Sequence, residues 1–328
     1  MAGLVAAARA RQLGNDVTVY EKGDRTGGSM LLSSCVIWRH VHFEDFRDDC
    51  PQGDEGLQRL IWERLDESLA WLESTTGVQP VRDDTKNPRT TGRRYDPGEL
   101  TAALSREAGE IRLRQPFPAT EQVVLATGGF PVRVARERGL LVRSNPWSEG
   151  DGLDHGRSLG AATAGELDEL YARAMPAPPA RIEESDYVRL SQLYGGRARV
   201  TNEFGDEFFP QPPAWHENDL AQAIACQPGG KAWFEVDDPA HPKVQAAREA
   251  GGDVIEADGG VRVHVAAGVT HTLGGLRVDE HTRVLREDGS PLDGLFAAGV
   301  DVGGVANGGY ASGLAQALVL GLVAAESL

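Results

Sequence analysis

The feature that most constrains the fold is a glycine-rich segment near the end of the chain, followed by small apolar residues. Leu295–Ala298 is short, apolar and flanked by glycine, as expected for a buried parallel strand. Residues 299–313 include six glycines, which let a backbone adopt positive φ and lie close to a ligand. Ser312 is suited to cap a buried helix that continues to the end of the chain. A strand, a glycine loop and a helix N-terminus together favour negative charge, because free N–H groups and the helix dipole converge there.

The start of the chain has a matching pattern. A helix of small residues is predicted from Gly3 to Gly14, and Asp16–Glu21 is predicted as a strand that ends in an acid. The spacing between Gly3 and Glu21 is close to that at which an acid contacts the ribose of a bound dinucleotide. A tightly packed crossover without a ligand remains the alternative for either glycine segment taken alone.

Four motifs occur in a fixed order along the chain. They are Glu21-Lys22 with Thr26-Gly-Gly-Ser29, then Ala126-Thr-Gly-Gly-Phe130, then His271-Thr-Leu-Gly-Gly275, then Gly294-Leu-Phe-Ala-Ala-Gly299 with the closing Gly-Gly-Tyr-Ala-Ser-Gly. Together they resemble the FAD-dependent family of fumarate reductases, succinate dehydrogenases and 3-ketosteroid dehydrogenases. The resemblance covers both ends and the middle of the chain, and is loose between residues 180 and 265.

The resemblance implies an α/β fold, with a Rossmann-like FAD-binding domain and an inserted α+β cap domain. We place the FAD-binding domain at residues 1–178 and 265–328, and the cap at 179–264, after the stiff connector Met175–Pro179. The positions that match FAD-contacting residues are Gly3, Glu21, Lys22, Gly27, Gly28, Ser29, Thr127, Gly128, Gly299, Asp301, Ser312 and Leu314.

The resemblance also points to catalytic residues. His271 matches the substrate-side histidine of the family, and Tyr310 or Tyr194 is a candidate to polarise a substrate carbonyl. Packing in the core is the alternative role for His271 and Tyr310. The two arginines of fumarate reductases are replaced here by Asn218 and Gly308. Because a dicarboxylate would then lack its cations, we expect an uncharged or weakly polar carbonyl substrate rather than fumarate or succinate.

The sequence departs from the family at two further places. The opening strand and the first two glycines of Gly-x-Gly-x-x-Gly are absent, and only Gly3 remains. We therefore expect that codons upstream of Met1 encode that strand, whose absence leaves sheet edges open. The segment before Ala126 is also short, with only residues 110–122. A degenerate relative without stable FAD or turnover is the alternative to an active oxidoreductase. A flavoprotein that also binds NAD(P)H is disfavoured, because no second glycine fingerprint appears.

Composition sets the remaining limits. The chain has 328 residues, enough for two domains, and its net charge of 33 − 49 = −16 argues against a nucleic-acid partner. Three cysteines without a C-x-x-C pair, no signal peptide and no membrane-spanning segment indicate a cytoplasmic protein. His40 and His42 lie between Cys35 and Cys50, but their spacing matches no usual zinc pattern, so we predict no metal. The expected partners are a small-molecule substrate and an electron acceptor that the sequence does not specify.

Several helices are predicted from apolar periodicity and from their first residues. They span Gly56–Thr75, Glu99–Ala108, Leu153–Ala162 and Asp219–Cys226.

Overall fold

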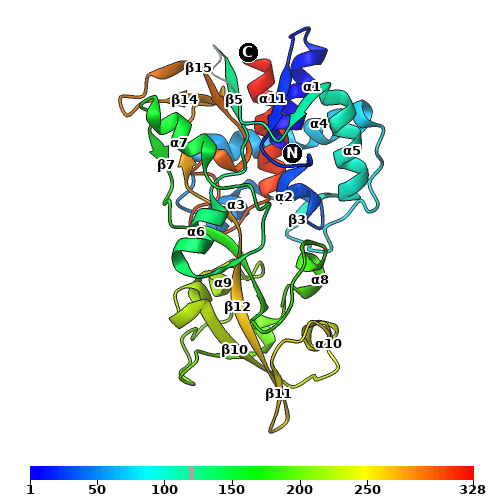
Figure 1. The fold of residues 1–328 in the computed structure, drawn as a ribbon, viewed down its shortest axis with the longest axis vertical. Coiled ribbons are helices and arrows are strands. Elements are labelled where there is room, and N and C mark those ends of the chain that lie inside the picture. Colours follow the sequence, from blue (N-terminus) through cyan, green and yellow to red (C-terminus); the bar gives the residue numbers. More distant parts are fainter. Residues whose placement is uncertain (118–121) are drawn as a thin grey trace. The chain divides into compact units, whose positions relative to one another are not determined.

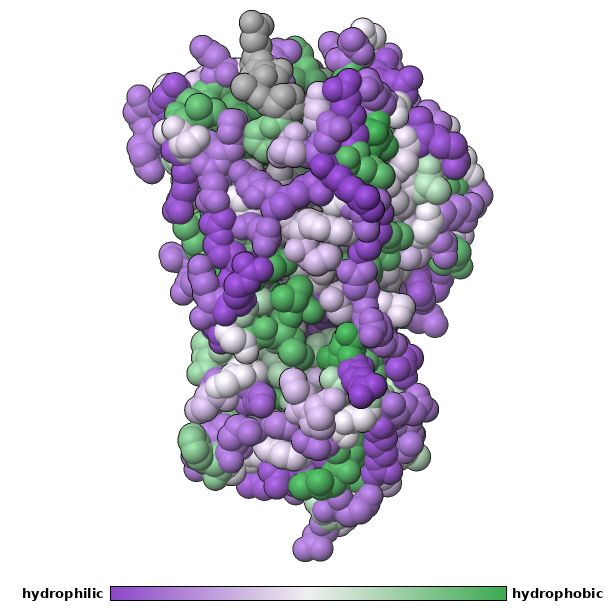
Figure 2. Space-filling view, viewed as in Figure 1, coloured by the Kyte–Doolittle hydropathy of each residue, from purple (hydrophilic) through white to green (hydrophobic). Residues whose placement is uncertain are grey.

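The computed structural model describes residues 1–117 and 122–328, which form two compact units (Figure 1). The first unit comprises Met1–Phe130, Trp147–Glu169 and Thr272–Leu328. The second comprises Pro131–Pro146 and Leu170–His271, and is therefore inserted into the first. It is larger than the predicted cap of residues 179–264, because it also includes Pro131–Pro146 and begins before the Met175–Pro179 connector. Hydrophilic residues cover most of the face drawn in Figure 2.

The first unit is a mixed α/β structure. Its helices are α1 (Ala2–Gln12), α2 (Gly28–Leu31), α3 (Phe43–Asp49), α4 (Glu55–Thr76), α5 (Pro97–Ala108), α7 (Asp151–Ser158) and α11 (Gly313–Glu326). Its strands are β1 (Thr18–Glu21), β2 (Val36–His40), β3 (Thr90–Arg94), β4 (Glu110–Leu113), β5 (Val123–Leu125), β7 (Thr163–Ala164), β13 (Gly275–Leu276), β14 (Arg283–Leu285) and β15 (Pro291–Ala297).

The parallel strands of this unit carry its glycine motifs at their carboxyl ends. β15 pairs in parallel with β5, with Leu295 opposite Val123, which confirms the predicted buried parallel strand. β1 pairs in parallel with β4, which is built from the short segment expected before Ala126. Residues 118–121 of that segment lie outside the described residues. Among the described residues, β1 and β5 belong to separate sheets, and each is paired along one edge.

The two helices from the ends of the chain pack against each other (Figure 1). Seven small or aliphatic residues of α1 are buried, and α11 is buried along most of its length. The close approach depends on Gly321, where an added Cβ would lie 2.8 Å from the Ala2 carbonyl oxygen. The Ser312 hydroxyl accepts a hydrogen bond from the Ala315 N–H (3.2 Å), so Ser312 caps α11 as predicted.

Capping residues also account for α4 and α5. Asp54 accepts from the Leu57 N–H and begins α4, and Gly77 in the left-handed region ends it. Asp96 caps α5 in the same way. The predicted helix Leu153–Ala162 is wrong at both ends, since α7 begins at Asp151 and stops at Ser158. It cannot continue because Gly160 has φ +87°, outside the helical range.

The second unit is an α+β structure. Its helices are α6 (Pro131–Arg138), α8 (Tyr187–Leu190), α9 (Asn218–Ala225) and α10 (Pro242–Glu249), and its strands are β6 (Leu141–Val142), β8 (Leu170–Pro176), β9 (Arg199–Thr201), β10 (Lys231–Val236), β11 (Val254–Ala257) and β12 (Gly260–Thr272). β11, β12, β10 and β9 form an antiparallel sheet, and β6 and β8 also pair with β12. Its core includes Phe234, Val263, Leu220 and Ile224, so α9 packs on the sheet. The predicted strand Val261–Val265 is the middle of the longer β12.

Candidate functional site

The carboxyl ends of β5 and β15 are joined by one buried carboxylate. The Thr127 hydroxyl donates to Oδ1 of Asp301 (2.7 Å), and the Gly128 N–H donates to Oδ2 (2.9 Å). The Thr127 oxygen in turn accepts from the N–H of Gly152 at the start of α7 (3.1 Å). Three of the predicted FAD-contacting residues, Thr127, Gly128 and Asp301, therefore lie together.

The environment of Asp301 is unusual for a carboxylate. Burial raises its pKa above the ordinary range, while the hydrogen bonds from Thr127 and Gly128 oppose that rise by stabilising the charged form. An aspartate that is 2% exposed would be costly without these partners. Asp301 thus fixes the positions of two glycine loops that follow parallel strands.

The backbone around these loops is close to the first turn of α1. Gly299 has φ +66°, and an added Cβ would lie 3.0 Å from the Cβ of Ala2. Gly3, also in that turn, has Ala126 as its nearest neighbour, with 3.4 Å between their Cβ positions. The side chain of Gln316 donates to the carbonyl oxygens of Gly299 (2.9 Å) and Val302 (3.0 Å), which ties this loop to α11.

The predicted residues near β1 are held by local contacts. Glu21 at the carboxyl end of β1 accepts a hydrogen bond from the Gly23 N–H (2.6 Å). The Lys22 ammonium pairs with Glu149 (2.8 Å) and Asp151 (3.0 Å).

The next predicted glycines lie at the start of α2. Gly27 and Gly28 both have positive φ, and Ser29 follows them in that helix. An added Cβ at Gly27 would lie 2.7 Å from Thr101 of α5, so the turn needs glycine for space as well as for conformation.

Tyr310 lies in a loop that packs against the end of α3. Its backbone N–H donates to the sulfur of Cys50, and its ring lies 5.6 Å from the ring of Trp38. A side chain at Gly309 would collide with the Asp49 carbonyl oxygen. Gly308 has φ +86°, and an added Cβ would lie 3.1 Å from Pro51. The loop therefore leaves no room at Gly308 for the arginine that fumarate reductases carry.

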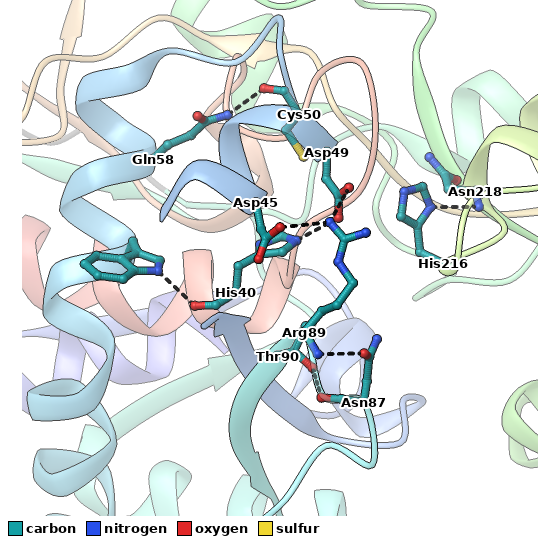
Figure 3. Close-up of polar contacts among 11 residues, drawn as sticks. His40, Asp45, Asp49, Cys50, Gln58, Asn87, Arg89, Thr90, His216 and Asn218 are labelled. Atoms are coloured by element: carbon teal, nitrogen blue, oxygen red, sulfur yellow. Dashed lines mark hydrogen bonds and ion pairs between the residues drawn. The ribbon is translucent and has the colours of Figure 1, made fainter. Parts of the chain in front are cut away.

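A polar network supports the same region from below (Figure 3). The buried His40 ring is hydrogen-bonded through Nε2 to Asp49 (2.9 Å), whose other oxygen pairs with Arg89 (3.2 Å). Trp38 and His40 also line a pocket of about 250 Å³ with Ser312 and Gln316 at the N-terminus of α11. The sequence analysis missed Trp38, because nothing in its local pattern marks it as a neighbour of Tyr310. Leu314 lies in the first turn of α11 beside this pocket.

His271 belongs to the second unit, where it lies near two arginines. Its ring is 5.0 Å from that of Tyr171, and the Arg173 guanidinium lies 4.8 Å above the same tyrosine ring. Burial, and then the charges of Arg143 and Arg173, lower the pKa of His271 to about 4. The imidazole is therefore neutral near pH 7 and can both donate and accept hydrogen bonds.

Asn218 and Tyr194 have structural roles. The Asn218 side chain accepts from the Ala172 N–H (2.9 Å) and donates to the Leu170 carbonyl (3.3 Å), which fastens α9 to β8. Its own N–H donates to Nδ1 of His216 (3.2 Å; Figure 3). Tyr194 is buried in the core of the second unit and donates to Gln192 (2.8 Å), so it is a packing residue and not a carbonyl-polarising one.

Comparison with known proteins agrees with the glycine motifs. The model of the FAD binding domain matches residues 234–313, and the model of the NAD(P)-binding Rossmann-like domain matches residues 1–34. The chain belongs to the FAD-dependent fumarate reductase and 3-ketosteroid dehydrogenase family. The recognition of the family from its four motifs, the Rossmann-like α/β class and FAD as the cofactor are thereby confirmed.

Individual relatives are distant. The NADH:fumarate oxidoreductase of Klebsiella pneumoniae (strain 342) is 24% identical and covers 97% of this chain. The probable fumarate reductase Ifc3 of Shewanella frigidimarina is 26% identical over 63% of the chain. The chain spans 45% and 44%, respectively, of the lengths of these two relatives.

Two solved structures share the fold. A flavocytochrome c3 fumarate reductase in its open conformation has a TM-score of 0.73 and 22% identity, over 99% of this chain and 76% of that one. The 3-ketosteroid-Δ4-(5α)-dehydrogenase of Rhodococcus jostii RHA1 has a TM-score of 0.69 and 19% identity, over 99% and 94%.

The first unit fits the cofactor of this family. Backbone positions without side chains at Gly3, Gly128 and Gly299 leave space where a chain of phosphates and sugars could lie against main-chain N–H groups. Glu21 stands at the end of a parallel strand, where an acid can bind a ribose hydroxyl. These observations are consistent with FAD in the first unit, whereas the individual contacts remain predictions.

Metal and membrane features were also sought in the described part of the chain. Within residues 1–117 and 122–328, no group of three or more His, Cys, Asp or Glu side chains could hold a metal ion. Burial raises the pKa of the Cys35 thiol to about 12 and raises that of Cys50 as well, so both are neutral thiols. None of the described helices has the length and apolar character needed to span a bilayer.

Proposed function

We propose that this chain is an FAD-dependent oxidoreductase that transfers a hydride between flavin N5 and a small molecule activated by a carbonyl group. The observation that carries the proposal is the joining of two glycine loops by Asp301, next to the first turn of α1. Bound FAD supplies the hydride chemistry, and the chain supplies binding, orientation and charge.

The residues of the chain have separate tasks in this proposal. Thr127, Gly128 and Gly299 offer backbone and hydroxyl contacts to the cofactor, and Glu21 binds the adenosine ribose. The N-terminus of α11 supports negative charge on the cofactor, because its dipole and unpaired N–H groups point outward from Ser312. His271 hydrogen-bonds the substrate as a neutral imidazole, and Tyr310 is the candidate donor to a substrate carbonyl.

The position of Tyr310 supports its candidacy. Its side chain is half-buried, while its backbone is fixed by Cys50 and its ring lies beside Trp38. A tyrosine held in this way retains a defined orientation and can still reach a ligand. Trp38 therefore acts as a positioning residue for Tyr310.

The proposal is tested on the purified chain. Its visible spectrum is recorded, the released cofactor is identified by chromatography, and colourless protein is incubated with FAD and re-examined. We expect retained FAD that dithionite bleaches and that a carbonyl-activated alkene reoxidises without oxygen. A folded chain that retains no FAD after incubation would instead be a degenerate relative without turnover.

A further inference from the structure

We propose that Arg143 and Arg173 form a binding site, within the second unit, for a carboxylate group carried by the substrate. The inference rests on the proposed function only in identifying the ligand as the substrate. It differs from the arrangement expected for fumarate reductases, because neither arginine stands at position 218 or 308.

Three neighbouring strands bring the site together. β12, which carries Thr270 and His271, pairs with β6 and with β8. Arg143 follows β6, and its N–H donates to the Val269 carbonyl (2.8 Å). Arg173 lies in β8. Both guanidinium groups therefore extend from strands that flank β12 near His271.

The side chain of Arg143 is oriented by uncharged groups. Its Nη1 donates to the Thr270 hydroxyl (2.9 Å), and its Nε donates to the Ser191 hydroxyl (3.2 Å). A guanidinium has five N–H donors, so these two bonds fix its plane and leave it further donor capacity. Because the named partners are hydroxyls, they orient the charge without neutralising it.

Arg173 is oriented by an aromatic ring and by a carbonyl. Its guanidinium stacks over Tyr171 and donates to the main-chain oxygen of His216. The His216–Asn218 turn is itself fastened to β8 through Asn218. Asn218, which replaces a family arginine, thus helps to hold a different arginine from the adjoining strand. This corrects the expectation that the site lacks cations.

The acidic group nearest to Arg173 is Glu217. This residue has φ +53°, an uncommon conformation for a side chain of this type, and begins α9. Burial raises the pKa of Glu217, and Arg173 opposes that rise. Lys243, whose pKa is lowered by burial and then by Arg143 and Arg189, adds positive charge nearby. In a chain of net charge −16, this local excess of cations favours an anion.

The chemistry of the group favours a carboxylate. Guanidinium groups bind carboxylates in a planar, two-bonded geometry that a lysine cannot reproduce. A neutral His271 between the arginines adds a hydrogen bond without adding charge. The expectation of an uncharged substrate is therefore replaced by that of a small organic acid.

The test is calorimetric titration of the FAD-incubated full chain with crotonate and with its uncharged amide, crotonamide. We expect crotonate to bind at least about tenfold more tightly than crotonamide. Arg143→Gln and Arg173→Gln should each weaken crotonate binding by about 10- to 100-fold, and leave crotonamide binding within about twofold. Arg181→Gln, at an exposed arginine of the same unit, is the matched control and should change neither.

Further arms keep the result unambiguous. Arg143→Lys and Arg173→Lys retain charge and should bind crotonate better than the Gln variants, with unchanged melting temperatures. Equal binding of acid and amide, no effect of the Gln variants, or preferred binding of inorganic phosphate would each overturn the proposal. Arginine-dependent crotonate binding by a chain that retains no FAD would support this site while contradicting the proposed oxidoreductase function.

Discussion

The hydroxyl of Thr127 lies 2.7 Å from Oδ1 of Asp301, although 174 positions separate the two residues in the sequence. This contact joins the loop after β5 to the loop after β15. Because both loops are rich in glycine, their backbones have few other restraints, and a buried carboxylate between them is an effective one. The geometry of the proposed cofactor site therefore depends on Asp301.

Replacing Asp301 by alanine should lower the free energy of unfolding by about 1–3 kcal/mol, since it leaves the buried Gly128 N–H without its acceptor. The same change should reduce FAD retention. Urea denaturation and the flavin absorbance of the purified protein measure the two effects. Asp293→Ala, at an exposed position in β15, is the control and should have little effect on either. Wild-type stability and FAD content in Asp301→Ala would remove Asp301 from the site.

Gly299→Ala tests the close approach of the glycine loop to α1. Alanine at φ +66° costs about 1–2 kcal/mol from conformation alone, and its Cβ would also crowd Ala2. Gly289→Ala is a matched control, because Gly289 has φ +83° but no neighbour within 4 Å of the added carbon. We expect both variants to lose stability by urea denaturation and only Gly299→Ala to lose FAD. Equal losses in the two variants would show that contact with Ala2 is unimportant.

Glu21→Ala should weaken FAD binding by about 1–3 kcal/mol, the cost of leaving ribose hydroxyls without partners. Titration of the flavin-free protein with FAD, followed by flavin fluorescence, measures the change. Glu110→Ala in the neighbouring strand β4 removes a comparable exposed acid and serves as the control. An FAD affinity equal to wild type in Glu21→Ala would leave Glu21 with only its local bond to Gly23.

The sequence predicted elements whose residues carry their own signals. The helix at Glu55–Thr76 was recognisable because its leucines recur at helical spacing and a capping aspartate precedes it. The parallel strand at Leu295 was recognisable because it is apolar and flanked by glycine. The carboxylate–hydroxyl link from Asp301 to Thr127 could not be predicted, since no local pattern relates the two residues.

The arginine site shows a second limit of such reasoning. Position-by-position comparison found that the family arginines are absent at positions 218 and 308. It did not find Arg173, because a side chain from an adjoining strand can supply the same charge through the pairing of β8 with β12. The space around Gly308 likewise depends on Pro51, which lies far away in the sequence.

His271→Gln separates a substrate role from simple packing. The pKa of His271 falls from 6.5 to about 4 on folding, so the unfolded chain binds more protons than the folded chain between these pH values. The wild type should therefore lose about 3 kcal/mol of stability as the pH falls from 6.5 to 4. His271→Gln should lack that loss, and His281→Gln, at an exposed histidine, should retain it. Urea denaturation across this pH range measures the difference.

At pH 7.5 the histidine is neutral in both states, so His271→Gln should keep nearly wild-type stability and FAD content. If the imidazole hydrogen-bonds the substrate, stopped-flow reduction of the flavin by a substrate, or its reoxidation by one, should slow by about tenfold or more, because one bond to the ligand is lost. If His271 only packs, the variant should instead be less stable at both pH values and react at the wild-type rate. That second pattern would return His271 to the core of the second unit and leave substrate binding to the arginines beside it.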